Sequence, residues 1–244
     1  MVTVHHQLSK KTFLKFDAVL FDCDGVLVDS EPITNGVLRD MLAESGWVLT
    51  PTECMQLFVG KAVKDELQII EQNIGKAVTE AWMAEFRQRR NNGLVAGLQA
   101  IDGAVKAVAT IHEHHAGCIA CVSGADRFKV ELQLNKCGLM AYFTGRIFSG
   151  HELSRSKPFP DVYLAAAAAL RVDAKRCAVV EDSVTGVLAG VAAGCTVFGY
   201  CPPEAGQQSA AELLGAGAAV TFADMAQLPG LLGCVTSLAF PLHP

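Results

Sequence analysis

Two aspartates separated by a single residue follow an apolar segment near the start of the chain. Residues 18–21 are apolar, and Asp22, Asp24 and Gly25 come directly after them. In an extended strand, residues two apart point to the same face, so both carboxylates leave the strand on one side. Glycine lets the backbone turn sharply there and approach a ligand. Such a pair suits a nucleophile beside a general acid, with a cation to offset the repulsion between the two charges.

The same residues also fit an ordinary turn, because Asp and Gly are common turn formers. Both interpretations stay open at this point. The residues that follow the other strands of the chain must decide between them.

The elements that position these aspartates alternate between strands and helices. The pattern predicts strands at 118–122, 145–148, 177–180, 196–200 and 218–222, and helices at 101–112, 127–137, 160–170 and 185–193. Such alternation predicts an α/β fold with a doubly wound parallel sheet. Residues 31–98 show helical periodicity with little strand signal, which predicts a small helical domain inserted after the first strand. The catalytic core is then discontinuous and comprises residues 1–30 and 99–244.

Composition excludes several classes of protein. The chain has 244 residues and a net charge of −5, which argues against a nucleic-acid partner. No apolar run approaches the roughly 18 to 20 residues that a membrane helix needs, and residues 1–15 lack the apolar centre of a signal peptide. Nine scattered cysteines in a chain of this length favour reduced thiols over disulfides. We expect a cytoplasmic protein with neither a nucleic-acid nor a membrane partner.

Polar residues follow four of the predicted strands. They are Asp22 and Asp24, then Ser123 and Gly124, then Lys157, and finally Glu181 and Asp182. Ligands bind at the carboxyl ends of strands in open parallel sheets, so these residues should converge on one crevice. Four carboxylates would meet there with only Lys157 to oppose them. A divalent cation is therefore expected, and oxygen ligands favour Mg²⁺.

These residues resemble the motifs of the haloacid dehalogenase-like superfamily. The first motif, Asp-x-Asp-Gly-x-Leu-x-Asp-Ser, is matched by residues 22–30, and the second by Ser123. The third, Lys-Pro-x-Pro-Asp-x-Tyr, is matched by residues 157–163, and the fourth by residues 181–183. A helical insert after the first motif is similar to the small all-helical cap of this family. The resemblance implies a Rossmann-type core with such a cap, in the β-phosphoglucomutase and phosphatase-like subgroup.

The resemblance also implies a two-step phosphoryl transfer. Asp22 would attack phosphorus and form an aspartyl phosphate, while Asp24 would protonate the leaving group and then deprotonate water. Ser123 and Lys157 would hold the phosphoryl oxygens. The implied metal ligands are Asp22, the backbone carbonyl of Asp24, Asp182 and, directly or through water, Glu181. The expected substrate contacts are Gly25, Gly60, Lys61, Lys64, Ser123, Gly124 and Lys157.

Other polar residues near the motifs have structural explanations. Asp29 and Asp161 fit turns or helix starts, and either Ser123 or Asp126 can cap the helix predicted at 127–137. Arg127 fits a structural or surface role as well as a place in the second motif.

Three positions in the motifs bear on which activity of the family to expect. The presence of Asp24 argues against a dehalogenase, which lacks this acid. The mutase subgroup carries a histidine twelve residues after the nucleophile, where this chain has Thr34, and many phosphatases carry asparagine in place of Gly124. We expect a Mg²⁺-dependent phosphatase that acts on a small phosphorylated metabolite such as a sugar or sugar-acid phosphate. A sugar phosphomutase and a catalytically idle binding protein are the alternatives, and monomer and dimer both stay open.

Overall fold

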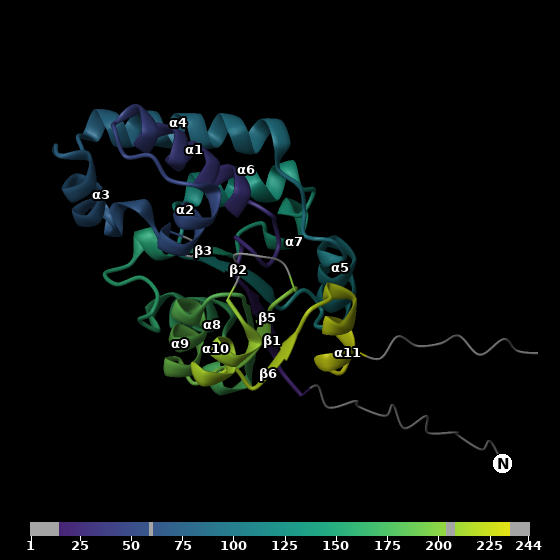
Figure 1. The fold of residues 1–244 in the computed structure, drawn as a ribbon. Helices are drawn as coiled ribbons and strands as arrows, with labels where there is room; N and C mark the ends of the chain where they lie inside the picture. Colours follow the sequence, from purple (N-terminus) through teal and green to yellow (C-terminus); the bar gives the residue numbers. More distant parts are fainter. Residues whose placement is uncertain (1–14, 59–60, 204–207, 235–244) are drawn as a thin grey trace, which may run out of the picture.

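A parallel sheet of six strands forms the centre of the protein (Figure 1). The computed structural model describes residues 15–58, 61–203 and 208–234. The strands are β1 (Ala18–Phe21), β2 (Ile119–Ser123), β3 (Ile147–Ser149), β4 (Cys177–Glu181), β5 (Thr196–Tyr200) and β6 (Val220–Phe222). Their order is β3-β2-β1-β4-β5-β6, and all neighbours are parallel. Strands β2 and β3 follow β1 on one side of it, whereas β4, β5 and β6 lie on its other side. The order of the strands therefore changes direction between β1 and β4, and the predicted doubly wound α/β fold is confirmed.

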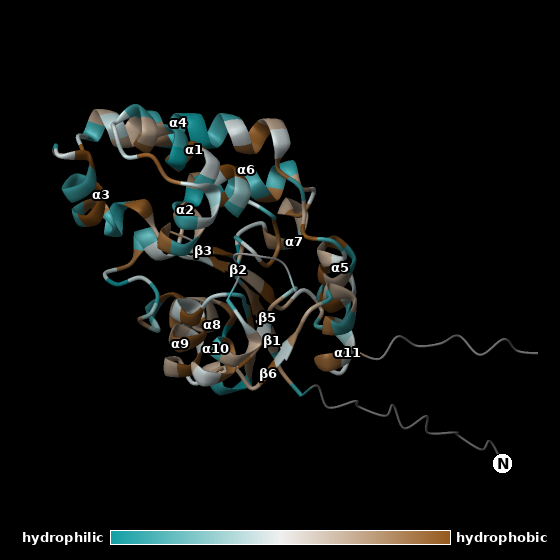
Figure 2. Ribbon diagram, viewed as in Figure 1, coloured by the Kyte–Doolittle hydropathy of each residue, from teal (hydrophilic) through white to brown (hydrophobic). Residues whose placement is uncertain are grey.

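Helices cover both faces of this sheet. The helices α5 (Ala104–His114), α6 (Arg127–Lys136), α7 (Met140–Phe143) and α11 (Leu228–Leu231) lie on one face, and α8 (Asp161–Leu170), α9 (Val184–Ala192) and α10 (Ala210–Gly215) on the other. Strand β1 feeds both cores, because Val19 and Phe21 pack on the first side and Ala18 and Leu20 on the second. Figure 2 accordingly shows hydrophobic residues along the central strands. A strand buried on both faces reads as a continuous apolar run, which is why β1 was recognisable.

Four helices between β1 and α5 share a separate hydrophobic core. They are α1 (Glu31–Glu44), α2 (Pro51–Phe58), α3 (Leu67–Ile74) and α4 (Glu80–Gly97), with the 3-10 turn η1 (Val63–Asp65) between α2 and α3. Buried side chains that include Leu38, Met41, Ile70 and Phe86 pack on one another in this core, whereas Leu94 near the end of α4 packs with the core on the sheet. In Figure 1 they lie together at one end of the sheet. We propose that they constitute the insert predicted for residues 31–98.

The two segments that join these helices to the sheet run side by side. Val28 forms an antiparallel bridge with Ala100, the Asp29 amide donates to the Gln99 carbonyl at 3.0 Å, and the Ile101 amide donates to the Leu27 carbonyl at 3.1 Å. The insert is therefore anchored by backbone hydrogen bonds immediately beside the first motif.

The shortest elements were missed at the level of sequence. These are α7, α10, α11 and the 3-10 turns η1, η2 (Gly150–Glu152), η3 (Ala174–Arg176) and η4 (Met225–Gln227). Segments of three to six residues span too few turns to show a hydrophobic period.

Two expectations from composition bear on the described residues. All nine cysteines are free thiols, as expected. Among the helices that the structure describes, none has both the length and the apolar character of a membrane span. The cytoplasmic location and the lack of a nucleic-acid partner stay predictions.

His115, at the end of α5, should make stability depend on pH. The residue is 4% exposed, its Nδ1 lies 3.1 Å from the Ile111 carbonyl, and its Nε2 has no partner within the described ranges. Burial lowers the pKa of this imidazole, with the hydrogen bond to Ile111 opposing the effect. The unfolded chain then binds a proton more readily than the folded one, so stability should fall as pH drops below about 6.5.

Urea midpoints on either side of that pH would check this expectation. His115→Leu should flatten the dependence, whereas the same change at half-buried His112 serves as the control. Equal pH dependence in the wild type and in His115→Leu would contradict it.

Candidate active site

The polar residues predicted to converge do so where the strand order reverses. Phe21 of β1 pairs with Val180 of β4, and the Asp22 amide donates to the Val180 carbonyl at 3.0 Å. Asp22 therefore lies beside Glu181 and Asp182 at the carboxyl edge of the sheet. This is the edge where ligands bind in doubly wound folds.

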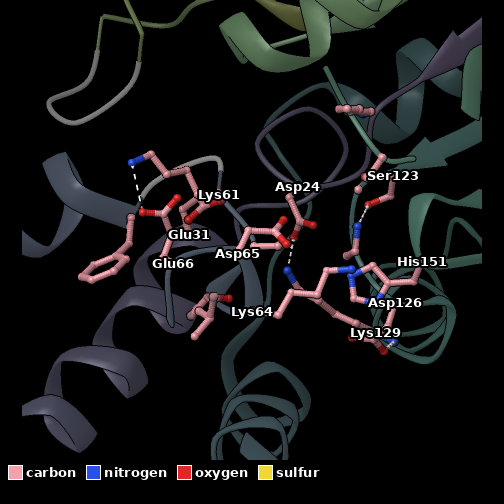
Figure 3. Close-up of a pocket in the computed structure, with 18 of the residues that line it drawn as sticks. Asp24, Glu31, Lys61, Lys64, Asp65, Glu66, Ser123, Asp126, Lys129 and His151 are labelled. Carbon is pink, nitrogen blue, oxygen red and sulfur yellow. Dashed lines mark hydrogen bonds and ion pairs between the residues drawn. The ribbon is translucent and has the colours of Figure 1, made fainter. Parts of the chain in front are cut away.

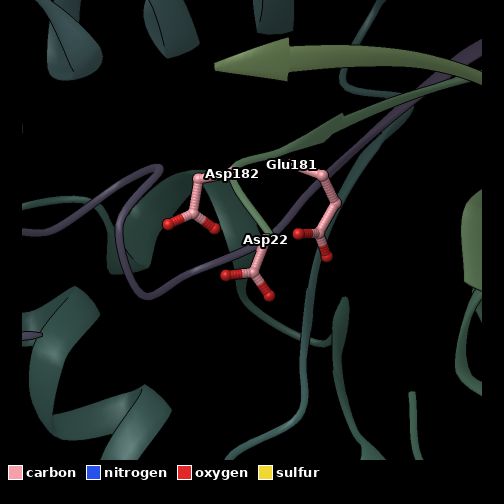
Figure 4. A group of neighbouring side chains, drawn as sticks. All are labelled: Asp22, Glu181 and Asp182. Atoms are coloured by element: carbon pink, nitrogen blue, oxygen red, sulfur yellow. The ribbon is translucent and has the colours of Figure 1, made fainter. Parts of the chain in front are cut away.

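Three carboxylates at this edge are arranged as a possible cation site (Figure 4). Ligand atoms of Asp22, Glu181 and Asp182 all lie within 4.8 Å of one another. Burial raises the pKa of Asp22 to about 8, with Glu181 and Asp24 adding to the effect and Lys157 opposing it. Burial, followed by the charges of Glu181 and Asp22, raises the pKa of Asp182 well above its usual range. A cation among these oxygens would stabilise the ionised forms, and an all-carboxylate donor set fits Mg²⁺.

Lys157 is held at the centre of this group. Its Nζ donates to Asp22 Oδ1 at 2.5 Å, to Glu181 Oε1 at 2.6 Å and to the Val122 carbonyl at 3.0 Å. The side chain is 8% exposed, so its charge is poorly screened by water. It can therefore balance the buried acids and face an anionic ligand.

The two acids at the end of β4 differ in their partners. Glu181 Oε1 also accepts a hydrogen bond from Tyr163 at 2.6 Å, and Oε2 accepts from the hydroxyl and amide of Ser183 at 3.0 and 3.3 Å. Within the described ranges, by contrast, no donor contacts the Asp182 carboxylate. Asp182 is thus free for a cation, whereas Glu181 is occupied in holding Lys157.

Two glycines make room for these carboxylates. Gly25 has a φ of 75°, and a Cβ added there would lie 2.0 Å from Asp182 Oδ2. A Cβ added at Gly186 would lie 1.9 Å from the carboxyl carbon of Glu181. No side chain fits at either position while the acid stays in place. Gly25 therefore shapes the site through its backbone.

Asp24 has a different environment from Asp22. Its Oδ1 accepts hydrogen bonds from Lys129 Nζ at 2.7 Å (Figure 3), from Gln133 Nε2 at 2.7 Å and from Ser30 Oγ. Burial alone would raise the pKa of Asp24, but the charge of Lys129 and these three hydrogen bonds lower it to about 2. Asp24 is consequently a carboxylate at neutral pH, and its second oxygen is left for a ligand.

Lys129 and Gln133 are site residues that sequence reasoning missed. The expectation that only Lys157 opposes the acids was wrong, because Lys129 is also buried, with 8% of its side chain exposed. Lys129 and Gln133 are one helical turn apart on α6 and share its buried face with Val130 and Leu134. The sequence did contain a signal for them, because a lysine and a glutamine stand at helical spacing among the apolar residues of the predicted buried face.

Ser123 of the second motif does not cap the helix that follows it. Ser123 ends β2, is 1% exposed, and its Oγ accepts a hydrogen bond from the Ala125 amide at 3.0 Å. Asp126, and not Ser123, caps α6, since its Oδ1 accepts from the Lys129 amide at 2.9 Å. Ser123 is therefore free of the capping role.

The remaining scaffold residues also have defined partners. Asp161 begins α8 and pairs with Arg155 at 2.9 Å, as expected for a helix start. Arg127 pairs with Glu152 and donates to the Ile147 carbonyl at 2.9 Å, which makes its role structural.

A cavity of about 580 Å³ extends from the sheet edge to the inserted helices. Among the predicted site residues, those that line it are Asp22, Asp24, Lys61, Lys64, Ser123, Gly124, Lys157 and Asp182. Lys61 forms an ion pair with Glu66 at 3.5 Å, whereas Lys64 has no such partner in the described chain. Gly25 and Glu181 lie behind the lining, and Gly60 falls outside the described residues.

Three carboxylates and a buried lysine thus lie together at the edge of the sheet where the cavity opens. The family model for haloacid dehalogenase-like hydrolases matches residues 16–194. The chain therefore belongs to the haloacid dehalogenase-like hydrolases.

Similar proteins agree with this placement. The 6-phosphogluconate phosphatase of Escherichia coli strain K12 is 33% identical over 189 residues, which cover 77% of this chain and 83% of that protein. A phosphoglycolate phosphatase of Xanthomonas campestris pv. campestris is 30% identical over 188 residues, covering 75% and 84%. A crystal structure of a HAD family hydrolase from Deinococcus radiodurans R1, with bound phosphate and sodium, is 34% identical in sequence and superposes with a TM-score of 0.74. The superposition covers 91% of this chain and 99% of that one. The predicted phosphatase class is confirmed.

Gly186→Ala tests the packing behind Glu181. The added methyl group would displace the Glu181 carboxylate and release Lys157, so we expect a loss of about 1–3 kcal/mol in unfolding free energy. Phosphatase activity should fall steeply, because Lys157 loses its fixed position. Gly215→Ala is the matched control, since a Cβ there meets nothing within 4 Å. Wild-type kcat/KM in Gly186→Ala would refute the role given to this packing.

Proposed function

We propose that this hydrolase is a Mg²⁺-dependent phosphatase that releases phosphate from a small sugar or sugar-acid phosphate through an aspartyl-phosphate intermediate. The observation that carries the proposal is the position of Asp22, which lines the cavity, accepts a hydrogen bond from Lys157 and lies within 4.8 Å of the Asp182 carboxylate. The names of the similar phosphatases, which refer to small phosphorylated metabolites, support it.

In this proposal Asp22, Asp182 and the backbone carbonyl of Asp24 would hold the metal. Glu181 would support the site indirectly, because both of its oxygens already accept hydrogen bonds from the protein. Bound Mg²⁺ would offset the negative charges of the nucleophile and the phosphate, so that the two can approach.

Asp22 is the nucleophile. Its Oδ1 is held by Lys157, which leaves the other oxygen to attack phosphorus. A new P–O bond then forms as the bond to the leaving oxygen breaks, and this divides one hard displacement into two steps. Ser123 Oγ accepts from the Ala125 amide, so its own proton is free for a phosphoryl oxygen. Lys157 stabilises the charge that develops on the phosphoryl group.

Asp24 is the general acid and base. Because its Oδ1 is occupied by three donors, Oδ2 is the atom that would carry the proton in the first step. Asp24 is ionised in the free site, but the negative charge of a bound phosphate ester favours protonation of Oδ2. Oδ2 then gives this proton to the leaving oxygen and later takes one from the attacking water. The ionised state that Lys129 favours suits the second step, in which Asp24 removes a proton from the attacking water.

Thr34 favours hydrolysis over the mutase alternative. Thr34 lines the cavity, and its Oγ1 is buried without a hydrogen-bond partner in the part of the chain described. A hydroxyl can bind a substrate oxygen but does not titrate near neutral pH as an imidazole does. It cannot replace the histidine that couples sugar binding to proton transfer in the mutases. The idle binding protein is disfavoured by the intact arrangement of Asp22, Lys157 and Asp182.

Phosphate release from a panel of phosphometabolites would test the proposed activity. Release should require Mg²⁺, and Asp22→Asn should lower kcat by at least about 10⁴-fold, because the nucleophile is lost. Asp40→Asn is the matched control, at an acid whose side chain is 64% exposed and which does not line the cavity. Metal-independent release, or full activity in Asp22→Asn, would refute the mechanism, and isomerisation of glucose 1-phosphate without net release would favour the mutase.

Lys129→Met tests the control of Asp24 by its cation. Loss of this charge leaves burial as the main influence, so the pKa of Asp24 should rise from its value of about 2. As the pH is lowered, Asp24 then becomes protonated sooner than in the wild type, and the step that needs ionised Asp24 is lost sooner. The acidic limb of the kcat profile should therefore move to higher pH. A profile from about pH 4 to pH 8 would measure this shift. Lys136→Met, at an exposed position of the same helix, should leave the limb in place.

A further inference from the structure

Two buried cations lie on the cavity wall away from the proposed metal ligands. Lys129 comes from α6 and Arg90 from α4, and their side chains are 8% and 9% exposed. Both residues line the cavity. Each is paired with an aspartate, Lys129 with Asp24 and Arg90 with Asp126, which offsets the cost of burying its charge. Two buried cations on the wall of one cavity are also suited to bind an anion there.

The protein uses only part of the hydrogen-bonding capacity of these two groups. Lys129 Nζ donates to Asp24 Oδ1 at 2.7 Å, and an ammonium has two further donors. Arg90 Nη2 donates to Asp126 at 3.1 Å, while its Nη2 and Nε contact Asn91 at 2.9 and 3.1 Å. For the described residues, no acceptor contacts Arg90 Nη1. Donors on both cations are therefore available to a ligand in the cavity.

A third cation extends this row toward the inserted helices. Lys64 of η1 lines the same cavity, is exposed, and has no ion-pair partner in the described part of the chain. Arg90 lies close to Lys129, because Asp126 accepts hydrogen bonds from both Arg90 Nη2 and the Lys129 amide. We call Lys129, Arg90 and Lys64 the anion subsite.

We propose that the anion subsite binds a carboxylate carried by the leaving group of the substrate, so that the enzyme selects phosphorylated sugar acids. This inference rests on the proposed phosphatase function and identifies the class of its substrate. If Asp24 contacts the leaving oxygen, Lys129 is the next group along the cavity, since its Nζ lies 2.7 Å from Asp24. A leaving group that extends from there reaches Arg90 and then Lys64.

Charge and shape favour a carboxylate over a second phosphate. Lys129 and Arg90 each have an acidic partner, Asp24 and Asp126, so the subsite offers little excess positive charge beyond Lys64. A single negative charge suits this balance, whereas a phosphate dianion would face the two aspartates with twice the charge. Arg90 can offer a carboxylate the two donors of Nη1, since its Nε and Nη2 are occupied by Asn91 and Asp126.

A pair of substrates that differ only at the far end would test the subsite. In sorbitol 6-phosphate a hydroxymethyl group replaces the carboxylate of 6-phosphogluconate. The wild-type enzyme with Mg²⁺ should prefer 6-phosphogluconate in kcat/KM by about tenfold or more, which corresponds to one charged interaction. Arg90→Gln should reduce this preference to about two- to threefold. The ratio separates recognition from a general loss of activity.

Arg89→Gln is the matched control on the same helix. Arg89 pairs with Glu44 at 2.6 Å and with Glu85 at 2.5 Å and does not line the cavity, so the preference should persist. Lys64→Gln, at an exposed position, should also weaken the preference and keeps the test decisive if Arg90→Gln does not fold. Calorimetry on Asp22→Asn, which should bind without turning over, should give tighter binding of 6-phosphogluconate than of sorbitol 6-phosphate.

The outcomes distinguish the subsite from the activity itself. Equal kcat/KM for the two substrates in the wild type would overturn the subsite and leave the phosphatase standing. A preference that survives in both Arg90→Gln and Lys64→Gln would overturn it as well. A larger kcat/KM for a sugar bisphosphate than for 6-phosphogluconate would overturn the choice of a carboxylate. No metal-dependent release from any of these compounds would instead refute the proposed function.

Discussion

Repulsion among buried carboxylates is the constraint on which the arrangement of this active site depends. The parallel register of β1 and β4 brings Asp22, Glu181 and Asp182 to one edge of the sheet, where burial makes their charges costly. Lys157 offsets part of this charge, and Tyr163 together with Ser183 fixes Glu181 so that Lys157 keeps its position. The remaining imbalance is what a divalent cation would relieve. The same negative field would therefore attract a cation to this edge of the sheet.

Two aspartates that are two residues apart have opposite tendencies to ionise because their partners differ. Burial and neighbouring acids raise the pKa of Asp22 to about 8, whereas Lys129 and three hydrogen bonds bring that of Asp24 to about 2. Such divergence between neighbouring carboxyls is how one site separates its chemical roles. In the proposed mechanism Asp22, on the side of the metal ligands, would be the nucleophile, and Lys129 and Gln133 of α6 would determine the ionisation of the general base Asp24.

The inserted helices contribute chemistry as well as cover. Arg90 of α4 reaches across to Asp126 at the start of α6, and Asp126 in turn caps the helix that presents Lys129. This contact links the insert to the residue that sets the charge of Asp24. The proposed substrate recognition by Arg90 and the proposed proton transfer at Asp24 would thus be physically connected through α6.

The sequence alone determined the elements whose signals are local. Apolar runs that end in acids revealed β1 and β4, alternating strands and helices predicted the doubly wound sheet, and motif spacing identified Asp22, Ser123, Lys157 and Asp182 as candidates. Local patterns could not show which distant side chains would pair. Only the tertiary structure placed Lys129 and Gln133 against Asp24 and Arg90 against Asp126, since these contacts join residues 36 to 109 positions apart. Their energies arise from burial and proximity in the folded chain, and neither property is encoded in spacing along the sequence.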